Sequence, residues 1–361
     1  MQSDDVVSSS RRIVTLEQFI VDTFSRIGED GIERPVDQPD QIGGGGTYAI
    51  IGARIFVSPC RLGMIVDYTS STLPESMRDT LERFGEEMWA FRGRADGHPT
   101  ASAINRYQGQ TRGFEYLTEP LLLTPLSLLN TAFGDPLPSA VHFISYPAPR
   151  AERVLSEITS LNATKGWNPM VIWEPEAESL EVIGRVSKDI DVIGPNHHEV
   201  SRLLPSLLPT SSQEEHLRDF YSQACIEFLK YKPKIGVVVR CGHLGCCFST
   251  TPDPTSISCS PSKIEVKWIP AYWHLNRKGW NEGRVVDPTG AGNAFMGGLA
   301  AALDSGESLD EAVIWGSVAA SFTIEQDGLP TLTRKNGKEL WNGEDPWDRV
   351  QEMQRDVGNL P

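Results

Sequence analysis

Cysteine and long apolar runs are scarce in this sequence, and their scarcity narrows the class of protein. Its 361 residues contain only six cysteines and no Cys-x-x-Cys pair, so we expect reduced, mostly buried thiols rather than disulfides or a zinc site. The longest apolar run, residues 295–303, is interrupted by glycine and too short to span a bilayer. Residues 1–12 are polar and contain no apolar signal-peptide core. We therefore expect a soluble, cytoplasmic protein.

Basic residues are also fewer than acidic ones. The sequence has 33 basic and 48 acidic residues, a formal net charge of −15, which argues against nucleic acid or an anionic membrane as a partner. Its 39% hydrophobic content supports a sizeable core, either in one large α/β domain or in two ordinary domains. The expected partners are small molecules, bound by a monomer or a homodimer.

The most informative segment is a glycine turn between an apolar pair and a helical run. Residues 285–286 read as a short strand that ends in the turn Asp-Pro-Thr-Gly-Ala-Gly-Asn, residues 287–293, and a small-residue helix follows. Gly290 and Gly292 would let an anion approach the backbone, and the unpaired N–H groups at the helix start would bind it. Alternatively, Asn293 could serve only as the N-cap of that helix.

From about residue 139, β-like runs alternate with helical ones, a pattern typical of a doubly wound, mostly parallel sheet flanked by helices. Such sheets bind ligands at the carboxyl ends of their strands. The strand candidates are residues 13–24, 141–145, 170–174, 190–194 and 235–240. Helices are expected over residues 214–230 and 308–324, the second opened by the capping-box pattern Ser-Leu-Asp-Glu.

The turn at residues 287–293 resembles the C-terminal signature of the pfkB, or ribokinase-like, carbohydrate kinase family, which usually reads Asp-Thr-Thr-Gly-Ala-Gly-Asp. The resemblance implies a ribokinase-like α/β fold with a small β lid, and an anion hole for the transferring phosphate at Gly290, Ala291 and Gly292. It also implies ATP and Mg²⁺, with a monovalent cation such as K⁺ as a further candidate. In the family the last Asp is the catalytic base. This sequence has Asn293 there, and an amide cannot accept a proton as a carboxylate does.

Weaker motifs resemble the nucleotide side of the family's site. Asn196-x-x-Glu199 resembles an element that orders magnesium, water and phosphate, which makes Glu199 the candidate metal-binding residue. A carboxylate in the first turn of a helix is also favoured by the helix dipole alone, so this role has a structural alternative. The turn at residues 240–245 resembles the glycine turn that lines the nucleotide. The implied cofactor-binding residues are Asn196, Glu199, Arg240, Gly242, Gly245 and Thr289.

The acceptor side departs further from the family pattern. Residues 43–49, Gly-Gly-Gly-Gly-Thr-Tyr-Ala, look like the substrate element, with threonine where many members have asparagine. An aspartate near the end of the first predicted strand falls where sugar kinases place a carboxylate for two hydroxyls. Together with Trp-Glu-Pro at residues 173–175, these motifs resemble a fungal subgroup that includes a yeast killer-virus maintenance protein. The implied substrate-binding residues are Asp22, Gly44, Gly45, Thr47 and Arg112.

The expected organisation is one pfkB-like domain over residues 12–333, with lid elements within about 25–42 and 90–118. A disordered tail would precede it at residues 1–11, and a C-terminal tail would follow at 334–361. Two functions remain open. The chain is a kinase for a hydroxyl of a sugar-like or nucleoside-like molecule, slowed by Asn293, or a weak or inactive nucleotide-binding pseudokinase with a regulatory role. On the first view, Asn293→Asp should raise phosphotransfer at least about tenfold.

Overall fold

The computed structural model describes residues 11–28, 30–108, 111–252 and 264–358. A nine-stranded sheet forms its centre: β1 Ile13–Thr15, β5 Leu62–Tyr68, β6 Trp89–Gly93, β9 Ala140–Ile144, β10 Met170–Glu174, β11 Val192–Ile193, β12 Gly236–Arg240, β13 Cys246–Thr250 and β14 Lys267–Ile269. Their order across the sheet is β14-β13-β12-β11-β10-β9-β1-β5-β6. Pairing is parallel from β12 to β6, and β13 and β14 add an antiparallel edge. The predicted α/β, mostly parallel architecture is confirmed.

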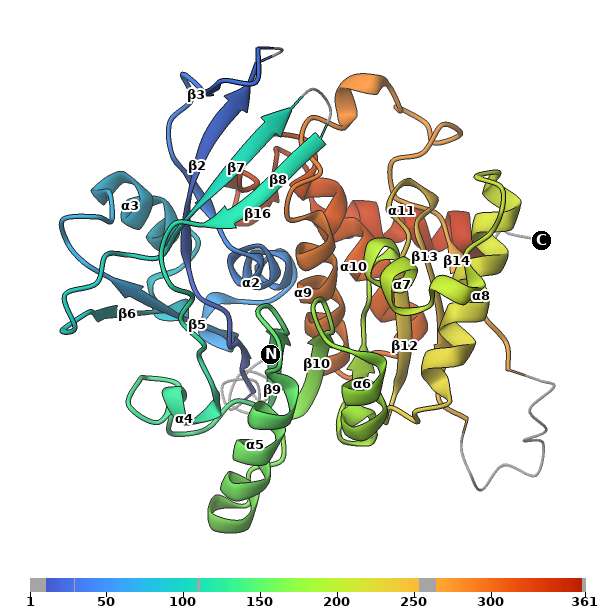
Figure 1. The fold of residues 1–361 in the computed structure, drawn as a ribbon, viewed down its shortest axis with the longest axis horizontal. Coiled ribbons are helices and arrows are strands. Elements are labelled where there is room, and N and C mark those ends of the chain that lie inside the picture. The colour runs from blue at the N-terminus through green and yellow to red at the C-terminus, as the bar shows by residue number, and fades with distance from the viewer. Residues whose placement is uncertain (1–10, 29, 109–110, 253–263, 359–361) are drawn as a thin grey trace.

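Helices cover both faces of this sheet (Figure 1). One face packs against α2 Gly45–Arg54, α3 Glu75–Arg83, α9 Ala291–Asp304, α10 Leu309–Thr323 and α11 Pro346–Gly358. The other packs against α4 Pro125–Leu128, α5 Ala151–Lys165, α6 Leu180–Val186, α7 His197–Leu203 and α8 Glu214–Leu229. Successive strand residues such as Ile13 and Val14 enter the two different core clusters. Burial on both faces explains why the strands are apolar throughout rather than alternating.

Two glycine contacts fix α2 against α9. A Cβ added to Gly297 would lie 1.7 Å from the carbonyl oxygen of Ala49, and one added to Gly52 would lie 2.2 Å from that of Ala294. Only glycine allows the two backbones to approach so closely. The start of α2 consequently lies beside the start of α9, where a Cβ on Gly45 would be 3.1 Å from Nδ2 of Asn293.

A second, smaller sheet stands beside the central one (Figure 1). Its strands are β2 Ile20–Ile27, β3 Glu33–Pro35, β4 Gln41–Gly43, β7 Ser102–Gln108 and β8 Thr111–Tyr116, in the order β3-β2-β7-β8 with β4 paired to β2. The prediction of one strand over residues 13–24 is wrong, because the chain leaves the central sheet after Thr15 and enters the small sheet at Ile20. Between them Glu17 turns aside to pair with the buried Arg150.

The predicted strand at residues 285–286 is also wrong. Val285 and Val286 are 38% and 52% exposed and follow a short 3-10 helix, Glu282–Arg284. The edge of the central sheet is already taken by β14, and the N–H of Val286 donates instead to the carbonyl of Ile324 at 2.7 Å. The β propensity of two valines is thus overridden by the route of the chain from β14 to α9.

The remaining predicted elements have clear counterparts. The helices expected at 214–230 and 308–324 are α8 and α10, and Ser308 Oγ accepts from the N–H of Glu311 at 3.3 Å. Beyond residue 331 the chain forms the hairpin β15 Leu332–Lys335 and β16 Lys338–Trp341, then α11, which buries Val350 and Met353 in the core. Within the described ranges, every helix is too short or too polar to cross a lipid bilayer.

Candidate active site

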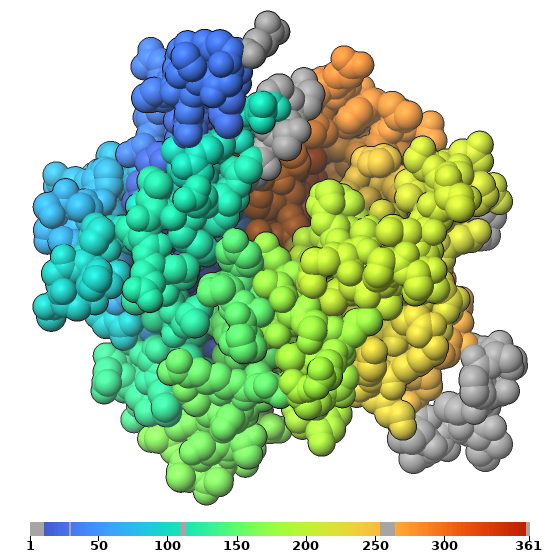
Figure 2. Space-filling model, in the orientation of Figure 1, coloured from blue at the N-terminus to red at the C-terminus, as the bar shows by residue number. Residues whose placement is uncertain are grey.

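A pocket of about 500 Å³ lies between the carboxyl ends of the central strands and the small sheet. Figure 2 shows the surface hollowed between the blue-to-cyan segments of the small sheet and the yellow-green segments around α7. The pocket joins residues far apart in the sequence, from β2, α2, β8, the end of β9 and the start of α9. Of the residues predicted for the site, those that line it are Asp22, Gly44, Gly45, Thr289, Gly290 and Asn293.

The glycine turn opens α9 on one side of this pocket. Gly290 is the N-cap at φ 75°, a backbone conformation that favours glycine, and a Cβ there would lie 2.2 Å from the ring of Tyr48. Ala291 is the first helical residue, and its N–H donates to Pro288 at 3.2 Å. No side chain among the described residues caps this 14-residue helix, so the N–H groups of Gly292 and Asn293 in its first turn are open to an anion.

Arg240 reaches this turn from the end of β12. A Cβ on Gly292 would lie 2.6 Å from NH1 of Arg240, so the guanidinium lies against the start of α9. Its NH2 donates to the carbonyl of Gly194 at 2.8 Å, while its Nε has no hydrogen-bond partner among the described residues. A buried guanidinium beside open helical N–H groups makes this place favourable for phosphate.

Glu174, the last residue of β10, is buried at the centre of a polar network. Its Oε2 lies 2.7 Å from NH2 of Arg240, and its Oε1 lies 2.8 Å from Nε2 of His142. The other ring nitrogen of His142 lies 3.1 Å from Oγ1 of Thr15. Burial alone would raise the pKa of Glu174, but Arg240, His142 and Asn293 outweigh it and hold that pKa below its usual value. Glu174 is therefore ionised, and both of its carboxylate oxygens are bound by neighbouring side chains.

Asn293 belongs to the same network. Its Nδ2 donates to both carboxylate oxygens of Glu174, each at 3.1 Å. The alternative that Asn293 is the N-cap of its helix is wrong, since Gly290 holds that position and Asn293 is the third residue of α9. The side chain instead joins the start of α9 to the end of β10, at the wall of the pocket.

Asn196 and Glu199 form a reciprocal capping box at the start of α7. Asn196 Oδ1 accepts from the N–H groups of His198 and Glu199 at 2.9 and 3.0 Å, and Glu199 Oε2 accepts from the N–H of Asn196 at 3.0 Å. Burial raises the pKa of Glu199 to about 8. Neither residue lines the pocket, and Glu199 is nearly enclosed. Helix capping is therefore an observed role of Glu199, whereas metal binding by Glu199 remains a prediction.

The glycine turn after β12 lies next to α7 rather than in the pocket wall. Gly242 has φ +60°, and a Cβ on it would come 3.7 Å from Cε1 of His197. Gly245 has φ +92°, and a Cβ there would be 2.1 Å from the carbonyl of Ile269. The second glycine is thus required by the turn itself. Thr289, by contrast, lines the pocket, and its N–H donates to Asp287 Oδ1 at 2.9 Å.

Of the five predicted acceptor residues, three line the pocket, namely Asp22, Gly44 and Gly45. Asp22 is 6% exposed, lies in β2 and lines the pocket, and a Cβ on Gly43 would collide with its carboxylate at 2.1 Å. Gly44 is the N-cap of α2 at φ 92°. Thr47 is fully buried inside α2 and does not line the pocket. Arg112 lies in β8 opposite Tyr107, and its side chain falls outside what the structure describes.

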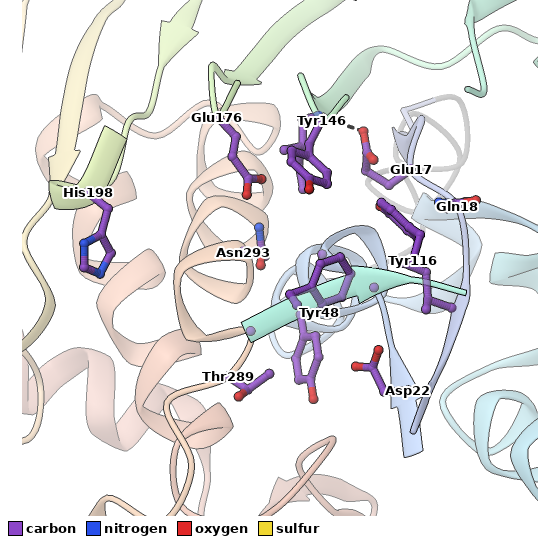
Figure 3. A pocket seen from close by; sticks show the side chains of 16 residues that line it. Glu17, Gln18, Asp22, Tyr48, Tyr116, Tyr146, Glu176, His198, Thr289 and Asn293 are labelled. Carbon is purple, nitrogen blue, oxygen red and sulfur yellow. Dashed lines mark hydrogen bonds between the residues drawn. The ribbon is translucent and has the colours of Figure 1, made fainter. Parts of the chain in front are cut away.

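Several residues that line the pocket are not among those predicted from the sequence. The aromatic ones form a cluster on one wall, with the rings of Tyr116 and Tyr146 stacked at 5.9 Å and Phe114 in edge contact with Tyr116 at 5.1 Å. Glu176 projects into the pocket in Figure 3. It follows β10 by two residues, so the rule that ligands bind at the carboxyl ends of strands could have found it. The other missed lining residues are Glu17, Gln18, Ile20, Tyr48, Ile144 and His198.

Metal ligands are sparse in the described ranges, which contain no group of three or more His, Cys, Asp or Glu side chains able to hold an ion. Magnesium in phosphoryl-transfer sites is commonly held by one or two carboxylates together with water and substrate phosphates. A single carboxylate such as Glu199 therefore fits Mg²⁺ delivered with a nucleotide better than a metal held by protein side chains alone.

Comparison with known proteins gives consistent similarities. The profile of the pfkB family carbohydrate kinases matches residues 138–335. The uncharacterised protein C16C9.01c of Schizosaccharomyces pombe is 31% identical over 365 residues, covering 96% of this chain and 94% of that protein. Protein MAK32 of Saccharomyces cerevisiae is 29% identical over 378 residues, covering 97% and 94%. The structure of an Arabidopsis thaliana ribokinase complexed with ribose and ATP has a TM-score of 0.59 at 18% identity, covering 88% of this chain and 94% of that one.

Proposed function

Since this chain belongs to the pfkB family of carbohydrate kinases and has a ribokinase-like fold, we propose that it transfers the γ-phosphoryl group of ATP to a hydroxyl of a sugar-like or nucleoside-like molecule. One observation carries the proposal. The same pocket has the open start of α9 on one side and the buried carboxylate of Asp22 on another. Phosphoryl transfer depends on positioning and charge stabilisation, and this pocket offers both.

The nucleotide phosphates fit the side of the pocket at Gly290 to Asn293. Open N–H groups of the first helical turn would bind them, and the guanidinium of Arg240 would offset their charge. Mg²⁺, when bound, neutralises charge on the phosphates. Glu199, held by Asn196 at the start of α7, is the residue that would orient water around it.

The acceptor fits the other side of the same pocket. Asp22 would accept hydrogen bonds from two hydroxyls, and Gly44 and Gly45 leave the backbone open to the ring. The stacked rings of Tyr116 and Tyr146 offer an apolar wall for the face of a sugar or a nucleobase. These features support a polyhydroxylated ring as the acceptor.

A nucleotide-binding pseudokinase is the second candidate, and Asn293 is the observation that favours it. The position that holds the family's base carries an amide, and that amide is bound to Glu174 on both oxygens. The two functions differ in turnover alone. Calorimetry with Mg·ATP and an ADP-release assay with D-ribose, D-fructose, adenosine and D-gluconate separate them. Binding heat together with ADP release supports the kinase. Binding heat without ADP release supports the pseudokinase, and the absence of binding heat with Mg·ATP contradicts both functions.

Asp22→Asn is expected to raise the KM for the acceptor about 10- to 100-fold, because an acceptor hydroxyl or the new amide would lose its partner at a cost of about 1–3 kcal/mol. Binding of ATP should be unchanged, since Asp22 lies across the pocket from the start of α9 (Figure 3). Steady-state kinetics of ADP release with the acceptor found in the screen measures the effect.

Asp40→Asn is the matched control. Asp40 is exposed just before β4 and lies outside the pocket, so the same change of charge should leave the acceptor KM unaltered. An acceptor KM that is the same in Asp22→Asn and Asp40→Asn would refute the assignment of the acceptor to Asp22.

A further inference from the structure

The pocket contains three carboxylates among the described residues, and their environments differ. They are Glu17, Asp22 and Glu176. A hydroxyl that attacks phosphorus must lose its proton, and a positioned carboxylate is a suitable acceptor for it. Because Asn293 cannot accept that proton, these three carboxylates are the candidates within the pocket.

The carboxylate of Glu17 is already bound by other groups of the protein. It forms an ion pair with the buried Arg150, and its Oε1 accepts from the N–H of Ile144 at 2.7 Å. The same guanidinium donates to the carbonyl of Ile144 at 2.7 Å and to that of Leu123 at 2.7 Å. Protonation of Glu17 would leave Arg150 buried without its counter-ion, which is costly. Glu17 is therefore a structural residue.

Asp22 lies on the wrong side of the pocket for this role. It is on β2 in the small sheet, whereas Thr289, the residue before the N-cap of α9, lies on the other side of Tyr48 (Figure 3). Its place suits the binding of acceptor hydroxyls that do not react.

Glu176 is the remaining carboxylate, and it is well placed. It comes two residues after the end of β10, and in Figure 3 its carboxylate points into the pocket on the side where Asn293 lies. Among the described residues, no hydrogen bond or ion pair engages this carboxylate; Arg202 contacts only the backbone carbonyl of Glu176, at 2.7 Å. The group is accessible to solvent through the pocket and free to take a proton.

The charges around Glu176 favour proton uptake near neutral pH. The pocket wall shields part of Glu176, and this partial burial, together with the nearby charges of Glu174 and Glu17, raises its pKa to about 7, while Arg240 and Arg202 oppose that rise. Contact with solvent through the mouth of the pocket weakens the contribution of burial, so the two neighbouring carboxylates are the firmer cause. Other titratable groups that face this part of the molecule are His198 and Glu199, both on α7, and the pocket residues Tyr116 and Tyr146. The charge of Glu176 bears on the hydroxyl of Tyr116, whose pKa burial raises well above its usual value. A general base works best when its pKa is near the working pH.

We propose that Glu176 is the general base of this chain and replaces the carboxylate that position 293 lacks. The inference rests on the proposed kinase function. The acceptor O–H gives its proton to a carboxylate oxygen of Glu176, the acceptor oxygen forms a bond to the γ-phosphorus, and the bond from that phosphorus to the β,γ-bridging oxygen breaks. ADP leaves with the electron pair, and Glu176 later returns the proton to water.

Glu176→Gln tests the proposal, because it keeps the size of the side chain and removes the base. Loss of a general base should lower kcat for the acceptor about 10²–10⁴-fold. In the wild-type protein, kcat/KM should rise with pH through about 7, since the base must be deprotonated, and the variant should lose this rise. Formate, added to Glu176→Ala, should restore part of the rate. Affinity for Mg·ATP, measured by calorimetry, should stay unchanged.

Glu181→Gln is the matched control, since Glu181 is on the exposed side of α6 and pairs only with Arg185 among the described residues. If Glu176→Gln keeps the wild-type kcat and pH profile, or if it loses Mg·ATP binding in parallel with rate, Glu176 is not the base and the kinase function stands. If the wild-type protein binds Mg·ATP but turns over neither an acceptor nor water between pH 6 and 9, both proposals are overturned.

Discussion

Gly292→Asp is expected to weaken the binding of Mg·ATP at least about 100-fold, equivalent to about 2.7 kcal/mol. A Cβ at this position already lies 2.6 Å from NH1 of Arg240, so the new carboxylate would pair with that guanidinium. It would also place a negative charge at the start of α9, where we propose that the phosphates bind. Calorimetry or a thermal shift with Mg·ATP measures the loss.

Gly93→Asp is the matched control for this change. Gly93 ends β6, has no neighbouring atom within 4 Å of an added Cβ and is not part of the pocket lining, so it adds the same charge without a contact. Gly292→Ala should give an intermediate loss, because it crowds the guanidinium without adding a charge. Circular dichroism confirms that each variant is folded. Undiminished affinity in a folded Gly292→Asp protein would contradict the anion site at α9.

Asn293→Asp is expected to destabilise the protein by at least about 2 kcal/mol at pH 8 rather than to activate it. The amide of Asn293 donates to both oxygens of Glu174, and losing a hydrogen bond to a charged group costs about 1.5–3 kcal/mol. An ionised aspartate would in addition face the ionised Glu174. Urea unfolding of the wild-type protein and the variant at the same pH measures the difference.

The pH dependence of this difference follows from the sign of the expected shift. A like charge and burial would raise the pKa of the introduced aspartate above that of an unfolded aspartate, about 3.9, so the variant could still donate a proton to Glu174 at low pH. The destabilisation should therefore be small near pH 4 and grow as the pH rises through the folded-state pKa. Asn293→Ala, which adds no charge, should show a loss that varies little with pH. A stable Asn293→Asp protein with faster phosphotransfer would contradict this account and favour a base at position 293.

The sequence and the structure give opposite expectations for Asn293→Asp, and the reason is one contact. Judged from the sequence alone, position 293 lacks the catalytic base, so restoring a carboxylate there should raise the rate of phosphotransfer. In the folded protein the amide of Asn293 is a donor to the buried Glu174, which is 119 residues away in the sequence. No local pattern around residue 293 shows which side chain it faces.

The anion turn illustrates what local sequence can predict. Two glycines in a turn, followed by helix formers from Asn293 onward, are enough to predict a helix that opens at a glycine turn, and in the structure α9 begins two residues earlier, at Ala291. The alternation of apolar and helical runs was likewise enough for the parallel sheet and its helices. The same reasoning failed for Val285 and Val286, because β propensity describes a single segment and does not show whether a sheet edge is free to pair with it.

By itself, the sequence determined the features that depend on neighbouring residues: the α/β class, the glycine turn before α9, the capping-box pattern that opens α10 at Ser308, and the amide at position 293. Only the tertiary structure decided which side chains share the pocket. It brought Asp22 from the small sheet to face the start of α9, bound Glu17 to Arg150, and left the carboxylate of Glu176 without a partner among the described residues. Burial and the charge of distant residues set these environments, and both exist only after the chain has folded.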